Sequence, residues 1–192
     1  MTLVGLCGKM GVGKDYIANT IILPYMRNVL GKTAMTWCFA DQLKVNAMTK
    51  YKLDYSNVYE DKTQHTRQLL QQEGTEYGRD LYGQDIWISY LDKWTQIMQH
   101  RGIEHFVITD VRFKNEIEYI KSRNGLVIKI NAPTRNKRRL DSENGTQVMK
   151  SHKSECDLDT LDDKVYDLVV DNDTDGRLSI ERIYNLLRNR LS

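Results

Sequence analysis

The stretch GKMGVGKD, Gly8 to Asp15, decides the fold of this chain. It matches the phosphate-binding pattern G-x-x-x-x-G-K-[ST] at both glycines and at Lys14, and it departs from the pattern at Asp15, where a hydroxyl residue is usual. An apolar run that reads as a buried strand, Leu3 to Cys7, comes directly before it, and a helix is predicted from about Lys14 to Met26. The order strand, glycine loop and helix is the context that a phosphate-binding loop requires.

Chemistry supports this interpretation of the loop. Glycines allow successive backbone N–H groups to curl around a phosphate, the helix N-terminus adds partial positive charge, and Lys14 reaches the outer phosphates. The alternative is a glycine-rich turn that carries a lysine by chance. Asp15 itself has two interpretations. Its carboxylate is a hard oxygen ligand for Mg²⁺, and it also lies in the first helical turn, where negative charge is stabilising.

A second carboxylate follows another predicted strand, in HFVITDVRF (105–113). Asp110 ends the apolar part of this run, which is where a P-loop fold holds the acid that organises its Mg²⁺. Arg112 comes two residues later and is placed to neutralise charge on a transferred phosphoryl group. The alternative for Arg112 is a surface ion pair with Glu116, four residues further on.

Basic residues cluster in APTRNKRRLDSENG (132–145), where Arg135, Arg138 and Arg139 share one face of a predicted helix. We expect a lid that neutralises phosphate charge and excludes water when it closes. A solvated basic face is the plain alternative. A nucleic-acid patch is disfavoured, because no aromatic residues alternate with these arginines.

The segments FADQLK (39–44) and TRQLLQQEGTEYGRDLYGQDIW (66–87) carry a further group of polar and aromatic side chains. Lys44, Arg67 and Arg79 are candidate anion-binding residues, which suits an acceptor with a phosphate. Trp87 either stacks on a base or anchors a core. In the predicted helix from Gln84 to Met98, the apolar residues Ile86, Tyr90, Trp94 and Ile97 recur at helical spacing, which serves a homodimer face or core packing equally well.

The whole pattern predicts an α/β fold with a parallel five-stranded sheet and helices on both faces, because apolar strands alternate with amphipathic helices. The other strands are expected at 33–39, 106–109, 126–130 and 166–170. We expect a single domain, with a core of about 1–40, 101–131 and 159–192, an insert of about 41–100 and a lid of about 132–158.

Bulk composition excludes several classes of function. With 192 residues, 40% hydrophobic content and a net charge of +2, the chain lacks the strong charge excess of many nucleic-acid or membrane-surface proteins. The three cysteines, Cys7, Cys38 and Cys156, form no zinc pattern, and Cys7 and Cys38 are expected to be free buried thiols. No leader and no membrane-length apolar run is present, so we expect a cytoplasmic protein.

Five stretches together resemble the phage- and virus-type deoxynucleoside monophosphate kinases: GKMGVGKD, FADQLK, TRQLLQQEGTEYGRDLYGQDIW, ITDVRFKNEIEYIKSRNGLVIKI and HKSE (152–155). The resemblance runs from Leu3 to about Asn172, and an Asp after the loop lysine is typical of this family. It implies a P-loop NTPase-type core with helical NMP-binding and lid inserts. It also implies ATP and Mg²⁺ as cofactors, a small deoxynucleoside monophosphate as substrate, and the cytoplasm of a host if the source is viral.

The resemblance also implies roles for individual residues. Catalytic roles fall on Lys14, Asp110, Arg112 and Arg138. The ATP-binding set is Gly8, Gly11, Val12, Gly13, Lys14, Asp15, Arg135, Arg139 and Asn172, the last near the adenine. The acceptor set is Phe39, Ala40, Lys44, Arg67, Gly74, Thr75, Arg79 and Trp87, and the metal ligands are Asp15 and Asp110.

Two rival functions remain at the level of sequence. A small-molecule kinase of the phosphomevalonate type carries the same loop and Asp, but its acceptor has no base, so the residues at 84–87 favour a nucleotide acceptor. A non-catalytic nucleotide-dependent switch or a DNA-associated binding protein also carries such a loop, and it would show no ADP release that depends on an acceptor.

Overall fold

The computed structural model describes residues 1–142, 157–173 and 176–191. The chain forms two compact units, of which the first contains Met1–Trp37 and Gln99–Ser192 and the second contains Cys38–Met98. Each unit is described below by itself.

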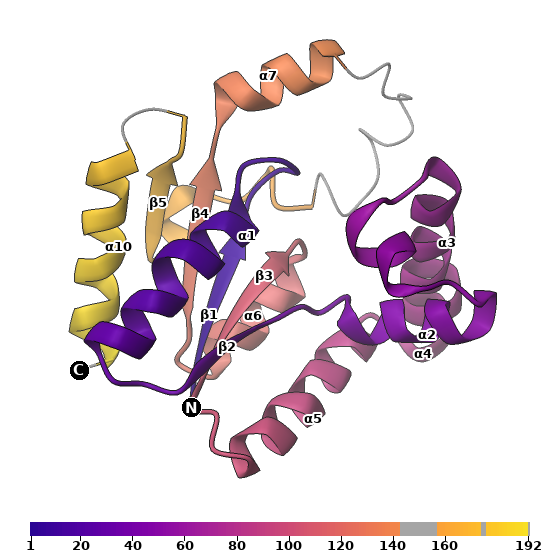
Figure 1. Ribbon diagram of the computed structural model, residues 1–192, viewed down its shortest axis with the longest axis horizontal. Helices are drawn as coiled ribbons and strands as arrows, with labels where there is room; N and C mark the ends of the chain where they lie inside the picture. The colour runs from indigo at the N-terminus through magenta and orange to yellow at the C-terminus, as the bar shows by residue number, and fades with distance from the viewer. Residues whose placement is uncertain (143–156, 174–175, 192) are drawn as a thin grey trace. The chain divides into compact units, whose positions relative to one another are not determined.

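The first unit is built on a five-stranded parallel sheet in the order β2-β3-β1-β4-β5 (Figure 1). The strands are β1 (Thr2–Cys7), β2 (Ala34–Trp37), β3 (His105–Val111), β4 (Leu126–Asn131) and β5 (Leu168–Asp171). In register, Val4 of β1 pairs with Val107 of β3 on one side and with Leu126 of β4 on the other. β1 is therefore the central strand, and its residues from Leu3 to Cys7 are all buried, as the continuous apolar run predicts for a strand covered on both faces.

One face of the sheet is covered by the N-terminal helix and by α10. The N-terminal helix is continuous in direction and comprises α1 (Lys14–Ile17) and the π-helical segments η1 (Ala18–Ile22) and η2 (Tyr25–Val29); α10 spans Gly176–Leu191. Ile22 and Met26 pack in one buried cluster with Leu6, Ile128 and Ile183. This cluster is the main hydrophobic core of the first unit.

The opposite face is covered by α6 (Lys114–Ser122), which packs against β1 and β4. Alternation along β1 turns Gly5 to this face, and a methyl group added there would lie 2.6 Å from Cδ1 of Ile120. The glycine thus permits close packing of helix and strand. Helices on both faces of a parallel sheet confirm the predicted α/β class.

Two shorter elements of the first unit lie toward its C-terminal half. Helix α7 (Pro133–Ser142) follows β4, and the 3₁₀ segment η5 (Asp163–Val165) precedes β5. Within the described residues, no helix has the length and apolar character that crossing a bilayer requires.

The second unit is helical. It contains α2 (Asp41–Tyr51), η3 (Ser56–Glu60), α3 (Gln64–Gly74), η4 (Thr75–Arg79), α4 (Asp80–Tyr82) and most of α5 (Ile86–His100). Local signals fix two of these boundaries. The Asp41 carboxylate accepts the backbone N–H of Cys38 at 2.9 Å before α2, and Thr63 Oγ1 accepts the N–H of Thr66 at 3.1 Å at the start of α3.

The predicted apolar stripe of the long helix is wrong in detail. The buried residues of α5 are Trp87, Leu91 and Thr95, whereas Tyr90 and Ile97 are exposed. Helical spacing fits both sets, because the helix is apolar over much of its circumference, and only tertiary packing selects one of them.

Candidate functional site: a phosphate-binding loop

The loop between β1 and α1 has the conformation that its glycines permit. Gly8, Gly11 and Gly13 have φ values of 138°, 86° and 91°, in the region that side chains disfavour. Space is also tight at two of them. A Cβ at Gly8 would lie 2.2 Å from the carbonyl oxygen of Ile130, and one at Gly13 would lie 2.7 Å from Nδ2 of Asn172. Larger residues at either position would force the loop out of this shape.

Lys14 is held inside the loop. Only 8% of the residue is exposed, and its Nζ donates to the carbonyl oxygens of Gly8 at 2.7 Å and Lys9 at 3.1 Å. The ammonium group is therefore positioned at the carboxyl end of the central strand before any ligand binds. This is the edge of a parallel α/β sheet at which such folds bind their ligands.

Two residues that are distant in sequence stabilise the loop by hydrogen bonds to the carbonyl oxygen of Val12. Asn172, directly after β5, donates from Nδ2 to the carbonyl oxygen of Val12 at 2.8 Å. Arg135, in the first turn of α7, donates from Nη2 to Val12 at 3.3 Å and to the carbonyl oxygen of Asn172 at 2.5 Å. Asp173 orients this arginine through an ion pair at 3.5 Å. The structure thus brings Val12, Arg135 and Asn172 together at the loop.

Asp15 is exposed in the first turn of α1. Its carboxylate is accessible to a cation and also lies where the helix N-terminus favours negative charge. Both interpretations of this residue fit the geometry, and its role as a metal ligand stays a prediction.

Asp110 and Arg112 lie at the carboxyl end of β3, which is the strand next to β1. Both are half-buried. The neighbour that positions this turn is Glu116, which is 2% exposed and whose Oε2 accepts the backbone N–H of Arg112 at 2.7 Å and of Phe113 at 3.1 Å. The carboxylate of Glu116 therefore fixes the backbone that carries Arg112.

Phe113 belongs to the same turn. It precedes α6 in an extended conformation, with φ −124° and ψ 152°, and its side chain is buried. Sequence reasoning missed the structural role of Glu116, because the capping signal is a Ser, Thr, Asp or Asn three residues before a Glu and Phe113 has no side-chain oxygen.

The predicted lid is only partly described. Arg138 and Arg139 belong to α7, but their side chains lie outside the described residues, and so does the segment 143–156 with the HKSE stretch and Cys156. Of the other cysteines, Cys7 is a buried thiol, as predicted, whereas the thiol of Cys38 belongs to a residue that is only half-buried.

In the second unit, the predicted acceptor residues Arg79 and Trp87 both contact a third one, Gly74. Its carbonyl oxygen accepts Nε1 of Trp87 at 2.9 Å and Nη1 of Arg79 at 3.3 Å. Trp87 is 3% exposed, so its ring serves the packing of this unit, as the core-anchor alternative has it. Any effect of Trp87 on an acceptor would therefore be indirect, through its hydrogen bond to the Gly74 carbonyl oxygen.

Lys44 has a different environment in the same unit. Its Nζ lies 3.4 Å from Oδ1 of Asp41 and 4.1 Å from the ring centroid of Tyr59. Tyr59 donates to the same Asp41 carboxylate at 3.0 Å, and burial, followed by the Asp41 charge, raises the pKa of its phenol. Of the other predicted acceptor residues, Phe39 is buried, whereas Ala40, Arg67 and Thr75 are half-buried.

Glu73 is a polar centre of the second unit, and its burial was not expected from the sequence. It is buried, and its Oε1 accepts Nζ of Lys50 at 2.5 Å and the hydroxyl of Tyr51 at 2.8 Å. Lys50 also lies 3.7 Å from the ring centroid of the exposed Tyr77. A Glu one residue before Gly74 gave no indication by itself that it would be buried.

Comparisons with known proteins agree with this geometry. No protein-family model matches the chain. A curated protein of Acanthamoeba polyphaga mimivirus, named "Putative deoxynucleotide monophosphate kinase", is 28% identical over 204 residues, which cover 96% of this chain and 93% of that protein. This relative confirms the resemblance seen in the sequence motifs.

Among solved structures, a sugar kinase from Janibacter sp. matches with a TM-score of 0.54 at 16% identity, over 98% of this chain and 95% of its own. Dephospho-CoA kinase from Campylobacter jejuni matches with a TM-score of 0.46 at 13% identity, over 100% and 96% of the two chains. The first likeness shows the fold, which is of the P-loop NTPase type. Together, the loop, the sheet and the mimivirus relative support a P-loop kinase, that is, a phosphotransferase.

Proposed function

We propose that the protein transfers the γ-phosphoryl group of ATP to a deoxynucleoside monophosphate, giving ADP and the deoxynucleoside diphosphate. The observation that carries this proposal is the enclosed Lys14, whose ammonium group is held by two loop carbonyls at the end of β1. A bound triphosphate offers stronger, charged acceptors to the same ammonium group. The name of the mimivirus relative supports the choice of acceptor.

The reaction needs little chemistry from the protein. The acceptor's phosphate oxygen is already ionised and nucleophilic near neutral pH, so positioning and electrostatic stabilisation supply most of the catalysis. Lys14 neutralises the donor phosphates, and Arg112, fixed by Glu116, neutralises the moving phosphoryl group. Arg135, Arg138 and Arg139 from α7 add positive charge on the nucleotide side and exclude water.

Mg²⁺ fits this site as a cofactor held by few protein ligands. Asp15 lies in the helix that follows β1, and Asp110 lies near the carboxyl end of the neighbouring strand β3. Both carboxylates are hard oxygen ligands. No group of three or more acidic, His or Cys side chains gathers in the part of the chain that the structure describes. Mg²⁺ in such kinases takes one or two carboxylates together with substrate phosphates, which matches this sparse set. When bound, the ion would neutralise charge on the donor phosphates.

The acceptor residues belong to the second unit. We assign the acceptor's phosphate to Arg67 and Arg79 and its base to the surface near Gly74 and Thr75. Tyr77 is the exposed aromatic ring of this unit that lies against a cation, Lys50, and it is a candidate for contact with the sugar or base.

The test is a coupled assay of ADP release with ATP, Mg²⁺ and a panel of ribo- and deoxynucleoside monophosphates. Mevalonate phosphate and a sample without acceptor complete the panel. We expect at least one deoxynucleoside monophosphate to accelerate ADP release far above the rate without acceptor. Acceleration by mevalonate phosphate alone would assign the protein to the rival small-molecule kinases, and slow ATP hydrolysis that no acceptor changes would contradict the proposal.

A further inference from the structure

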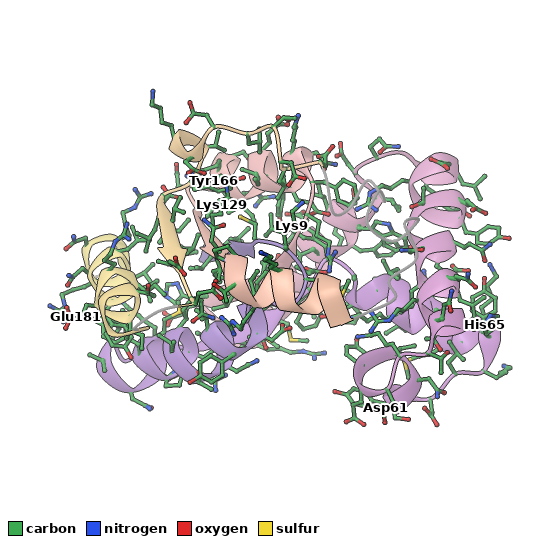
Figure 2. The ribbon with its side chains drawn as sticks, turned by 90° about the horizontal axis from the view of Figure 1, so that it is seen from above. Lys9, Asp61, His65, Lys129, Tyr166 and Glu181 are labelled. Carbon is green, nitrogen blue, oxygen red and sulfur yellow. The ribbon has the colours of Figure 1, made fainter. Side chains whose placement is uncertain are left out.

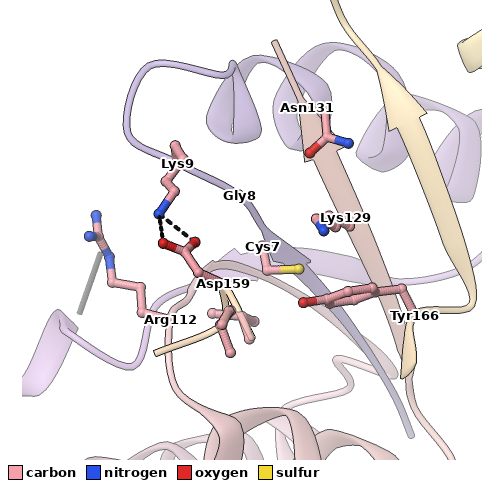
Figure 3. Close-up of a pocket in the computed structure, with 10 residues that line it drawn as sticks. Cys7, Gly8, Lys9, Arg112, Lys129, Asn131, Asp159 and Tyr166 are labelled. Carbon is pink, nitrogen blue, oxygen red and sulfur yellow. Dashed lines mark hydrogen bonds and ion pairs between the residues drawn. The ribbon is translucent and has the colours of Figure 1, made fainter. Parts of the chain in front are cut away.

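A cavity of about 290 Å³ lies in the first unit beside the phosphate loop (Figure 3). Cys7 of β1 and Lys129 of β4 pair in register and face into it. Their neighbours Leu6, Ile128 and Ile130 point to the other face, into the core with α1 and α10. The cavity is therefore on the α6 face of the sheet, whereas Lys14 extends from the helix on the opposite face.

Tyr166 has a buried hydroxyl without a hydrogen-bond partner among the described residues. The residue is 7% exposed, and its hydroxyl makes no hydrogen bond within the described residues. Figure 3 shows the hydroxyl directed into the cavity, toward Cys7 and Asp159. Buried hydroxyls are nearly always hydrogen-bonded, so this one is available to an acceptor atom of a bound ligand.

The charge around the cavity is positive. Lys9, Arg112 and Lys129 line it, and the lining also includes the carboxylate of Asp159, which contacts Lys9. Figure 2 shows Lys9, Lys129 and Tyr166 on the same part of the first unit. Burial raises the pKa of the Cys7 thiol and of the Tyr166 phenol to about 12 each, so both are neutral near pH 7 and the phenol is a donor.

A bound anion could readily displace the two aspartates that form ion pairs with Lys9 and Lys129. Lys9 contacts Asp159 at 2.5 Å, and Lys129 contacts Asp163 at 2.7 Å. Both aspartate side chains are more than half exposed, and ion pairs this exposed contribute little to stability. An anion with more charge and more oxygen atoms than a carboxylate would compete for both ammonium groups.

We propose that this cavity is a second anion site, for a small phosphate monoester. Its phosphoryl oxygens would accept from Tyr166, Lys9 and Lys129, and its carbon atoms would lie against Cys7 and Leu158. A phosphate monoester carries about −1.5 to −2 charges near neutral pH, and the three cations Lys9, Arg112 and Lys129 outnumber the carboxylates of Asp159 and Asp163. The volume lies at the lower end of ligand pockets, about 300–1,000 Å³, which suits a molecule smaller than a nucleotide. This site goes beyond the proposed kinase reaction, although Gly8 and Arg112 line the cavity and also belong to the proposed kinase site.

Isothermal titration calorimetry tests the site without any turnover. Inorganic phosphate, glycerol 3-phosphate and uncharged glycerol are titrated into the protein saturated with a non-hydrolysable ATP analogue, so that the loop cannot take up phosphate. A second arm uses the Lys14→Met variant without nucleotide. We expect saturable binding of both phosphates, tighter for glycerol 3-phosphate, and no binding of glycerol. Equal or weaker binding of glycerol 3-phosphate would overturn the monoester assignment, and absence of phosphate binding would overturn the site.

The variant Tyr166→Phe isolates the unpaired hydroxyl. We expect the Kd for phosphate to rise about tenfold or more, because a hydrogen bond to a charged group is lost. The melting temperature should not fall, since the hydroxyl has no partner within the described part of the chain. Tyr184→Phe is the matched control, because Tyr184 stacks on Tyr25 on the opposite face of the sheet, at 4.1 Å between ring centroids. An unchanged Kd in Tyr166→Phe, or a melting temperature that falls, would contradict the proposal.

Discussion

Removal of the Glu116 carboxylate should destabilise the protein strongly, although no motif marks this residue. The side chain is 2% exposed, and one oxygen accepts two backbone N–H groups, from Arg112 and Phe113. Each hydrogen bond to a charged group contributes about 1.5–3 kcal/mol, so Glu116→Ala should lower the free energy of unfolding by about 3 kcal/mol or more. Total stabilities are about 5–15 kcal/mol, so the loss is a large fraction.

The variant Glu116→Gln tests how much of this stabilisation comes from the negative charge of the carboxylate, because it keeps a hydrogen-bond acceptor in nearly the same place. The amide oxygen still accepts, but without charge each bond contributes only about 0.5–1.5 kcal/mol, so the variant should lose about half as much as Glu116→Ala. The measurement is urea unfolding of wild type, both variants and Glu118→Ala, an exposed control on the same helix. The control should stay within about 0.5 kcal/mol of wild type. If Glu116→Ala falls no further than the control, the carboxylate does not hold this turn.

Two other predictions concern charge. Asp15→Ala should raise the Mg²⁺ concentration needed for half-maximal activity more than it raises the Kd for ATP; an unchanged Mg²⁺ requirement would leave Asp15 only its role at the helix N-terminus. Burial lowers the pKa of His105, whose Nδ1 has no hydrogen-bond partner among the described residues. Its unfolded pKa is about 6.5, so as the pH falls through this value the unfolded state takes up a proton that the folded state does not, and stability declines. The melting temperature of wild type should therefore drop between about pH 7.5 and about pH 5.5 by more than that of His105→Gln, and equal drops would exclude this histidine as the cause.

Much of the first unit could be predicted from the sequence, because its strands are buried on both faces and read as short apolar runs. Leu126–Ile130 was expected as a strand, and β4 extends it only to Asn131. The loop could be predicted equally well. Its glycines are required by the positive φ values of the backbone, and Lys14 is required by the charge of a phosphate. Features that depend on neighbours in sequence were therefore recovered.

Features that depend on contacts between residues distant in sequence could not be predicted. The ion pair between Lys9 and Asp159 joins residues 150 positions apart, and neither residue stands in a motif that names the other. Tyr166 was expected to begin the fifth strand, but β5 begins at Leu168, and Tyr166 instead lines a cavity. Alternation of apolar residues predicts burial, and it does not predict which buried hydroxyl lacks a partner.

The central claim is that Lys14 neutralises the phosphates of the donor during transfer. The most direct measurement is the rate of acceptor-dependent ADP release by wild type, by Lys14→Met, which keeps much of the buried stem, and by Lys32→Met, a control outside the loop. We expect a fall of about 10²–10³-fold in kcat for Lys14→Met, with the fold intact by circular dichroism and the control unaffected. A Lys14→Met rate within about threefold of wild type would contradict it.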